Sequence, residues 1–135
     1  MSTPYGQPPQ PGPGGVSSDD KTWALAAHIG SLVTAWFAFG FIAPLLVMLV
    51  RENSPFVRAH AVESLNFQIS MLIYGVVGSV IAFLVVLLTF GIGAVVVIPL
   101  IVVVLMAVLV LVLIATTKAA DGQEYRYPLT MRLVK

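Results

Sequence analysis

Five polar side chains at helical spacing stand at the start of a long uncharged stretch, and these are the residues that could do chemistry. They are His60, Glu63, Asn66, Ser70 and Tyr74. At about 100° per residue they fall within one arc of roughly 120° on a helix that begins after Ser54. Imidazole, carboxylate, amide and hydroxyl groups at the edge of a membrane could line a polar path or bind a ligand.

This stripe has a second interpretation, as a polar seam where helices pack against each other and against lipid headgroups. Water and headgroups reach the first turns of a membrane helix, where His60 and Glu63 lie, so these groups do not require a dedicated site. The seam is favoured, and both interpretations stay open. Arg58 points away from the stripe, where its long side chain can reach the headgroups as an interfacial anchor.

A shared metal or haem site for the two histidines is not expected. If residues 22–50 cross the membrane in one piece, His28 lies about 30 Å from His60. Only a re-entrant first segment, broken at Gly40 or Pro44, would bring them together, so we expect His28 to pack between helices. The chain has no cysteine, and its acids and histidines form no catalytic set. We therefore expect no enzyme, no cofactor and no metal.

The composition predicts an integral membrane protein. Of 135 residues, 59% are hydrophobic and 10% are charged, which is too apolar for an ordinary soluble domain of this length. A formal net charge of +1 gives no attractive field for nucleic acid, which we exclude as a partner.

The apolar segments predict an all-α, polytopic membrane protein with three transmembrane helices. The helices cover about residues 22–50, 55–89 and 94–118. The first can kink or break near Gly40 or Pro44, and the sequence Phe-Gly-Ile-Gly at residues 90–93 supplies the turn between the other two.

Two tails flank the helices. Residues 1–18 are rich in proline and glycine and predict a disordered tail, which leaves residues 19–135 as the membrane domain. Residues 119–135 predict a short tail that lies along the membrane interface, where tyrosine and arginine side chains can anchor it. The predicted interfacial anchors are Arg58, Tyr125, Arg126 and Tyr127.

The basic residues predict an orientation for three spans. Lys21 would be the one basic residue on the side of the N-terminus and of the turn at residues 90–93, and the other Lys and Arg residues lie on the opposite side. The positive-inside rule then places the N-terminus outside and the C-terminus in the cytoplasm. The expected location is the bacterial cell (inner) membrane, as a multi-pass protein.

Two longer stretches resemble a known family. They read SPFVRAHAVESLNFQISMLIYG at residues 54–75 and AADGQEYRYPLTMRLVK at residues 119–135, with DKTWALAAHIGSL at residues 20–32 before them. Together they resemble a bacterial family of small membrane proteins grouped as similar to the Tic-twenty component of the chloroplast inner-envelope import machinery. The resemblance covers about residues 19–135. It implies a membrane protein without catalytic residues and a distant link to transport.

Two hypotheses of function follow. The first is a non-enzymatic accessory or assembly subunit of a larger membrane complex, of respiratory or secretion type, in which small residues let helices dock. The alternative is an oligomeric transport, channel or protein-translocation component in which the stripe faces a polar path. In both, the partners are the lipid bilayer and other membrane-protein helices, in a hetero-complex or a homo-oligomer.

Overall fold

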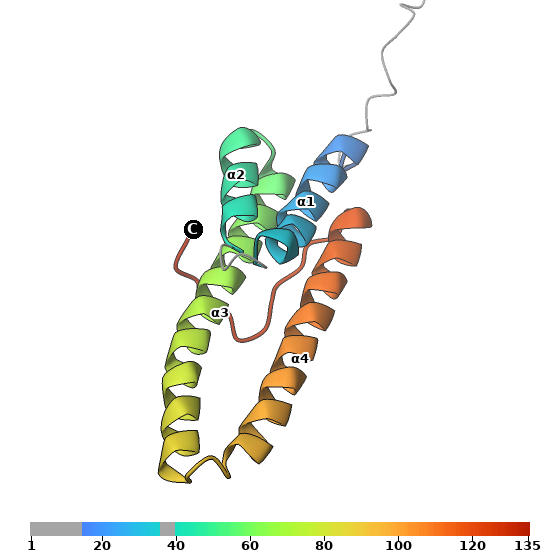
Figure 1. The fold of residues 1–135 in the computed structure, drawn as a ribbon. Helices are drawn as coiled ribbons and strands as arrows, with labels where there is room; N and C mark the ends of the chain where they lie inside the picture. Colours follow the sequence, from blue (N-terminus) through green and yellow to red (C-terminus); the bar gives the residue numbers. More distant parts are fainter. Residues whose placement is uncertain (1–14, 36–39) are drawn as a thin grey trace, which may run out of the picture.

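The computed structural model describes residues 15–35 and 40–135, which form four helices (Figure 1). The helices are α1 (Ser18–Ala35), α2 (Ile42–Val50), α3 (Pro55–Leu88) and α4 (Ala94–Ala120). Because no strand occurs in these described ranges, the all-α prediction is confirmed for them. Most of the predicted disordered tail at residues 1–18 lies outside the described residues, and its last residue, Ser18, already belongs to α1.

Two helices, α3 and α4, are long and apolar enough to cross a membrane. The Ser54 hydroxyl caps α3 by accepting a hydrogen bond from the Val57 N–H at 3.4 Å, with proline at the first helical position. At the other end of α3, the Gly91 N–H donates to the Val86 carbonyl at 2.8 Å and closes the turn into α4. The predicted helices at residues 55–89 and 94–118 lie close to these observed bounds.

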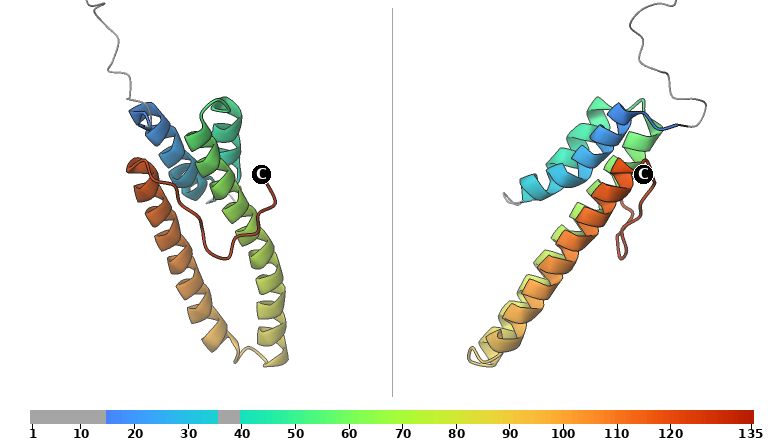
Figure 2. Two further views of the ribbon diagram at one scale, coloured as in Figure 1. Left: turned by 180° about the vertical axis from the view of Figure 1, so that it is seen from behind. Right: turned by 90° about the vertical axis from the view of Figure 1, so that its right-hand side faces the viewer.

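The prediction of three spans is not confirmed, because residues 22–50 do not form one helix. They divide between α1 and α2, which lie side by side as a hairpin (Figures 1 and 2). With 9 residues, α2 is only about 14 Å long, less than half of the hydrocarbon core of a bilayer. Of the predicted break positions, Gly40 lies in the turn before α2 and Pro44 lies within α2.

Close packing holds the hairpin together. A Cβ atom at Gly30 would lie 2.8 Å from the Cβ of Ala43, so the missing side chain lets α1 and α2 approach each other. Arg51, in the loop after α2, pairs with Asp19 at the start of α1, and its guanidinium lies 4.9 Å from the centre of the Trp23 ring. The hairpin therefore begins and ends at the same end of the molecule.

The molecule has two unlike halves along its length (Figures 1 and 2). The charged half consists of residues 15–35, 40–70 and 108–135, and the apolar half consists of residues 71–107. Every Asp, Glu, Lys and Arg of the described residues belongs to the charged half. The start of α1 lies there with the C-terminal tail, so the prediction that they lie on opposite sides of a membrane is not confirmed by the described residues.

Both hydrophobic clusters lie in the charged half. One joins α1, α2 and α3 and consists of Ala27, Val47, Val57 and Ala61. The other joins α3, α4 and the C-terminal tail and consists of Phe67, Val112, Ala115 and Tyr127. The core therefore encloses the part of the polar stripe that carries His60, Glu63, Asn66 and Ser70, whereas Tyr74 is 43% exposed.

Candidate functional site

The polar stripe of α3 is covered by the C-terminal tail, residues 121–135. This tail is not helical, and it runs down beside α3 and turns back on itself (Figure 1). Leu129 adopts a left-handed backbone, with φ of 56°, where the direction changes. An extended segment cannot satisfy its own N–H and C=O groups, so it needs partners from the helix beside it.

Glu63 holds the middle of the tail. Its side chain is buried, and its Oε1 accepts a hydrogen bond from the Tyr127 N–H at 2.6 Å. Its Oε2 accepts from the Arg132 guanidinium at 2.8 Å, and the two charged groups form a salt bridge. Glu63 therefore joins both arms of the folded-back tail to α3.

Asn66 binds the backbone of the last residues of the tail. Its Oδ1 accepts from the Leu133 N–H at 2.9 Å and from the Val134 N–H at 2.7 Å, and its Nδ2 donates to the Val134 carbonyl at 2.8 Å. The Ser70 hydroxyl accepts from the Met131 N–H at 2.8 Å, and the Tyr74 hydroxyl donates to the Leu129 carbonyl at 2.8 Å. These residues recognise backbone atoms of the tail.

His60, the first residue of the stripe, belongs to a chain of hydrogen bonds that includes His28. His60 Nε2 lies 2.9 Å from the Gln123 carbonyl oxygen, and His60 Nδ1 lies 2.9 Å from His28 Nε2. His28 Nδ1 in turn lies 3.0 Å from the Tyr127 hydroxyl. The expectation that His28 and His60 lie about 30 Å apart is wrong, because the α1–α2 hairpin returns to its starting end.

The acceptor at Gln123 fixes the direction of this chain. A carbonyl oxygen only accepts, so His60 donates from Nε2, and a neutral His60 must then accept at Nδ1 from His28 Nε2–H. His28 Nδ1 accepts in the same way from the Tyr127 hydroxyl. Burial, with a smaller contribution from His60, lowers the pKa of His28 to about 3, so this imidazole is neutral at physiological pH.

Tyr127, one of the predicted interfacial anchors, is buried inside the protein. Its side chain is only 2% exposed and stacks on Phe67, with ring centres 3.9 Å apart. Burial, followed by the neighbouring Tyr125 and Glu63, raises the pKa of the Tyr127 hydroxyl, which stays protonated and donates to His28. Tyr127 is therefore an internal residue that joins the tail to both α1 and α3.

The other predicted anchors lie nearer the surface. Tyr125 is half-buried and meets the Tyr127 ring edge to face, at 5.1 Å between ring centres. Arg126 is exposed. Arg58 is also exposed, and it donates to the Lys135 carbonyl at 3.2 Å, so it contacts the tail although it lies off the stripe.

The tail leaves α4 through a well-formed helix end. The Gly122 N–H donates to the Ala119 carbonyl at 3.1 Å and the Gln123 N–H donates to the Lys118 carbonyl at 2.9 Å, the two bonds of a Schellman motif. Gly122 has φ of 73°, which glycine adopts without steric cost. This ending turns the chain toward His60.

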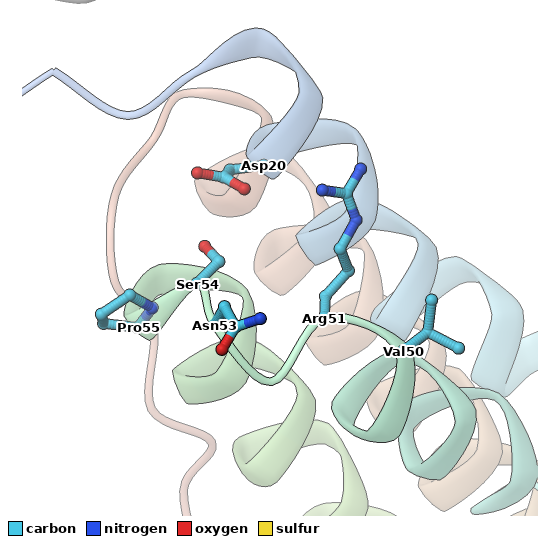
Figure 3. A pocket seen from close by; sticks show the side chains of 6 residues that line it. All are labelled: Asp20, Val50, Arg51, Asn53, Ser54 and Pro55. Atoms are coloured by element: carbon cyan, nitrogen blue, oxygen red, sulfur yellow. The ribbon is translucent and has the colours of Figure 1, made fainter.

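Two hollows lie beside these elements. The larger one, of about 590 Å³, is lined by Asp20, Val50, Arg51, Asn53, Ser54 and Pro55 at the mouth of the hairpin (Figure 3). Arg51 reaches from the loop toward α1 there and forms a salt bridge with Asp19. The smaller hollow, of about 200 Å³, lies beside the tail and is lined by Ala59, His60, Val62, Glu63, Glu124, Tyr125, Arg126 and Arg132.

Neither hollow groups enough ligands for a metal ion. Within residues 15–35 and 40–135, no three His, Cys, Asp or Glu side chains are grouped to hold a metal ion. Among these same residues, no buried side-chain nitrogen or oxygen lacks a hydrogen-bond partner. The stripe and the histidine pair therefore use their polar groups to fasten the tail and the α1–α2 hairpin to α3.

Sequence reasoning missed three participants in this arrangement: His28, Gln123 and Arg132. His28 was expected only to pack between helices, and the tail was expected to lie along the interface. The position of five polar groups on one apolar helix did indicate that a neighbour must satisfy them. It did not indicate that the neighbour is the end of the same chain.

Comparison with known proteins corrects the resemblance suggested by the sequence motifs. A family model matches residues 19–134, which is most of the chain, and it is not that of a Tic-twenty-like family. The search of curated proteins and the search of solved structures gave no match. The matched model is described as the magnetosome magnetite crystal formation protein family, MamF/MmsF, and this chain belongs to that family.

Proposed function

We propose that the protein is a non-enzymatic accessory membrane protein that acts in magnetosome formation. Its family is described by the formation of magnetite crystals in magnetosomes, and two of its helices are long and apolar enough to span a membrane. One observation supports an accessory role above the others. All five stripe residues form hydrogen bonds with the tail of the same chain, so the stripe serves to hold the tail.

The proposed orientation follows from the charges of the two halves. All seven Lys and Arg residues belong to the charged half, since the apolar half contains none. The positive-inside rule then places the charged half in the cytoplasm, together with both the start of α1 and the C-terminal tail. The turn at residues 89–93, which has no charged side chain, would lie on the other side.

This orientation favours an indirect effect on the mineral. Hard metal ions are bound by clustered carboxylate oxygens, and the side of the membrane that holds the turn would present no carboxylate from the described residues. The protein would therefore influence crystal formation through the membrane or through neighbouring membrane proteins. Exposed apolar side chains along both spans offer surface for lipid or for partner helices.

The alternative hypothesis, an oligomeric transport component, has less support. It requires the stripe to face a polar path, whereas the tail covers Glu63 and Asn66. Proteoliposomes that contain the full chain should then conduct ions no faster than protein-free vesicles. An ion flux that Glu63→Gln removes while the protein stays folded would contradict the accessory function.

A genetic replacement tests the proposed function. In a magnetite-forming bacterium that lacks its own member of the family, the full chain should reach the crystal-containing membrane fraction and restore crystal size, measured by electron microscopy. The variant Asn66→Ala, which weakens tail docking, should restore it less well, and the exposed Asn53→Ala is the matched control. Unchanged crystals with the protein absent from that fraction would overturn the proposal.

A further inference from the structure

The protein is much wider in its charged half than in its apolar half. In the charged half, α1, α2, α3, α4 and the tail lie side by side. In the apolar half, beyond the hydrogen bond between Tyr74 and the tail, α3 and α4 alone among the described elements continue toward their connecting turn (Figures 1 and 2). Each helix with its side chains is about 10–12 Å across, or about 100 Å² in cross-section. The charged half therefore exceeds the apolar half by about 200 Å², plus the area of the tail.

Burial follows the same division. The buried residues of α3 all lie between Val57 and Ser70, and those of α4 are Val112, Ala115 and Ala119. Residues 71–107 contain no buried side chain, so no further element of the described chain surrounds them. The narrowing therefore holds for the side chains as well as for the backbone.

The surface of the α1–α2 hairpin suits the hydrocarbon region better than the water above it. All nine residues of α2 are uncharged, and it directs Leu46 and Leu49 outward, with 55% and 62% of their surfaces exposed. Such side chains are stable next to lipid tails and costly in water. Because α2 is about 14 Å long, the hairpin can occupy about one leaflet of a core about 30 Å thick.

Polar contacts fasten this extra width to the spans. The Ser64 hydroxyl of α3 donates to the Ala27 carbonyl of α1 at 2.9 Å, close to the His28–His60 hydrogen bond. Both contacts are buried, and the α1–α2 hairpin is closed at its mouth by the Asp19–Arg51 pair. The width is thus a fixed property of the fold.

We propose that the protein is a membrane wedge that binds curved bilayers in preference to flat ones, with its charged half in the convex leaflet. A body that is wider in one leaflet fits where that leaflet is expanded relative to the other. The ligand is the bilayer itself, recognised by shape. This inference rests on the proposed membrane location and goes beyond it, because an accessory protein need not respond to curvature.

The charges give the wedge a direction. Charged side chains are costly in hydrocarbon, so the charged half stays in the leaflet that it entered. With that half cytoplasmic, the convex leaflet is the cytoplasmic one, as in a membrane that bulges into the cytoplasm. The protein would therefore gather where such a compartment forms.

Partition between vesicles of two sizes tests the wedge. Purified full chain is added to a mixture of small sonicated and large extruded vesicles of phosphatidylcholine with a minority of phosphatidylglycerol, and trypsin cleavage at Arg126 confirms that the charged half lies outside. The wedge predicts a protein density per lipid several-fold higher on the small vesicles. Equal densities on both vesicle sizes would overturn the wedge and leave the proposed function intact.

Matched variants separate shape from general hydrophobicity. Leu46→Ser with Leu49→Ser makes the lipid face of the α1–α2 hairpin polar and should remove most of the preference for small vesicles. Leu100→Ser with Val103→Ser changes two side chains of α4 in the apolar half, with similar exposed fractions of 60% and 64%. This variant should keep the preference for small vesicles. Equal losses in both variants would contradict the wedge, and failure of the full chain to insert would contradict the proposed function.

Discussion

Residues 55–70 and 71–88 of α3 belong to one continuous helix with two kinds of neighbour. The first segment packs against α1, α2 and the tail, and most of its inward side chains form hydrogen bonds or buried contacts. The second segment has exposed apolar side chains on nearly every position. The difference shows that a membrane helix gains specific structure only where another part of the protein can satisfy its polar groups.

The two halves also differ in the interactions that fix the position of the chain. In the charged half, buried side chains such as Glu63 and Asn66 fix the tail by hydrogen bonds, which are directional and therefore select particular backbone groups. In the apolar half, lipid tails are as apolar as the side chains, so exposed valine and leucine give little preference for one neighbour over another. Substitutions of the same kind should therefore have unequal effects in the two halves.

The largest difference is expected for a phenylalanine pair. Phe67→Ala removes a fully buried ring that stacks on Tyr127 and should lower the free energy of unfolding by about 3–5 kcal/mol. Phe83→Ala removes a ring that is 65% exposed, and the change should stay within about 0.5 kcal/mol. Unfolding by SDS titration from mild detergent measures both. Similar losses at the two positions would break the distinction between the halves.

Asn66→Ala should have the next largest effect, because it removes three hydrogen bonds to the tail. It leaves the Leu133 and Val134 N–H groups without their side-chain partner, at a cost of about 2 kcal/mol. Amide hydrogen exchange should then accelerate in residues 121–135 more than in α4. The exposed Asn53→Ala is the control, and unchanged tail exchange in Asn66→Ala would show that these bonds do not hold the tail.

Acidification should weaken the charged half through His28. Its folded pKa is about 3, below the unfolded value of 6.5, so the unfolded chain takes up a proton first as pH falls. Stability is therefore full above pH 6.5 and falls by about 1.4 kcal/mol per pH unit between that value and about pH 3. Thermal unfolding in detergent across this range measures the slope.

His28→Gln provides the control for that measurement. This variant lacks the His28 imidazole and should make the dependence of stability on pH less steep, although its stability at pH 7 will be lower. An equally steep loss of stability in the variant would mean that another group carries the effect.

The sequence was sufficient for the elements whose limits are set by local chemistry. Ser54 and Pro55 indicated the start of α3, and the glycines after Phe90 indicated the turn into α4. Both depend on neighbouring residues in the chain, which a sequence displays directly. The two helices that are long and apolar enough to span a membrane could also be recognised from the sequence.

The α1–α2 hairpin and the docked tail could not be predicted in the same way, because they depend on contacts between distant residues. An apolar run over residues 22–50 has the same composition whether it spans once or returns, and only the Gly30–Ala43 approach and the bond between His28 and His60 decide between them. The tail residues Leu129, Met131 and Leu133 alternate with polar ones. This pattern is as compatible with a tail that lies along the membrane interface as with one that docks on α3. The polar stripe itself was visible from its spacing, whereas its partner was not.

Labelling of single cysteines tests the central claim, that residues 22–50 return to their starting side. The chain has no native cysteine, so Gly15→Cys, Asn53→Cys and Ile92→Cys each give one exposed thiol. In intact cells and inverted vesicles, a membrane-impermeant maleimide should reach residues 15 and 53 from the same side and residue 92 from the opposite side. Labelling of residue 15 together with residue 92, with residue 53 protected, would mean that the first segment crosses the membrane once and would contradict the account.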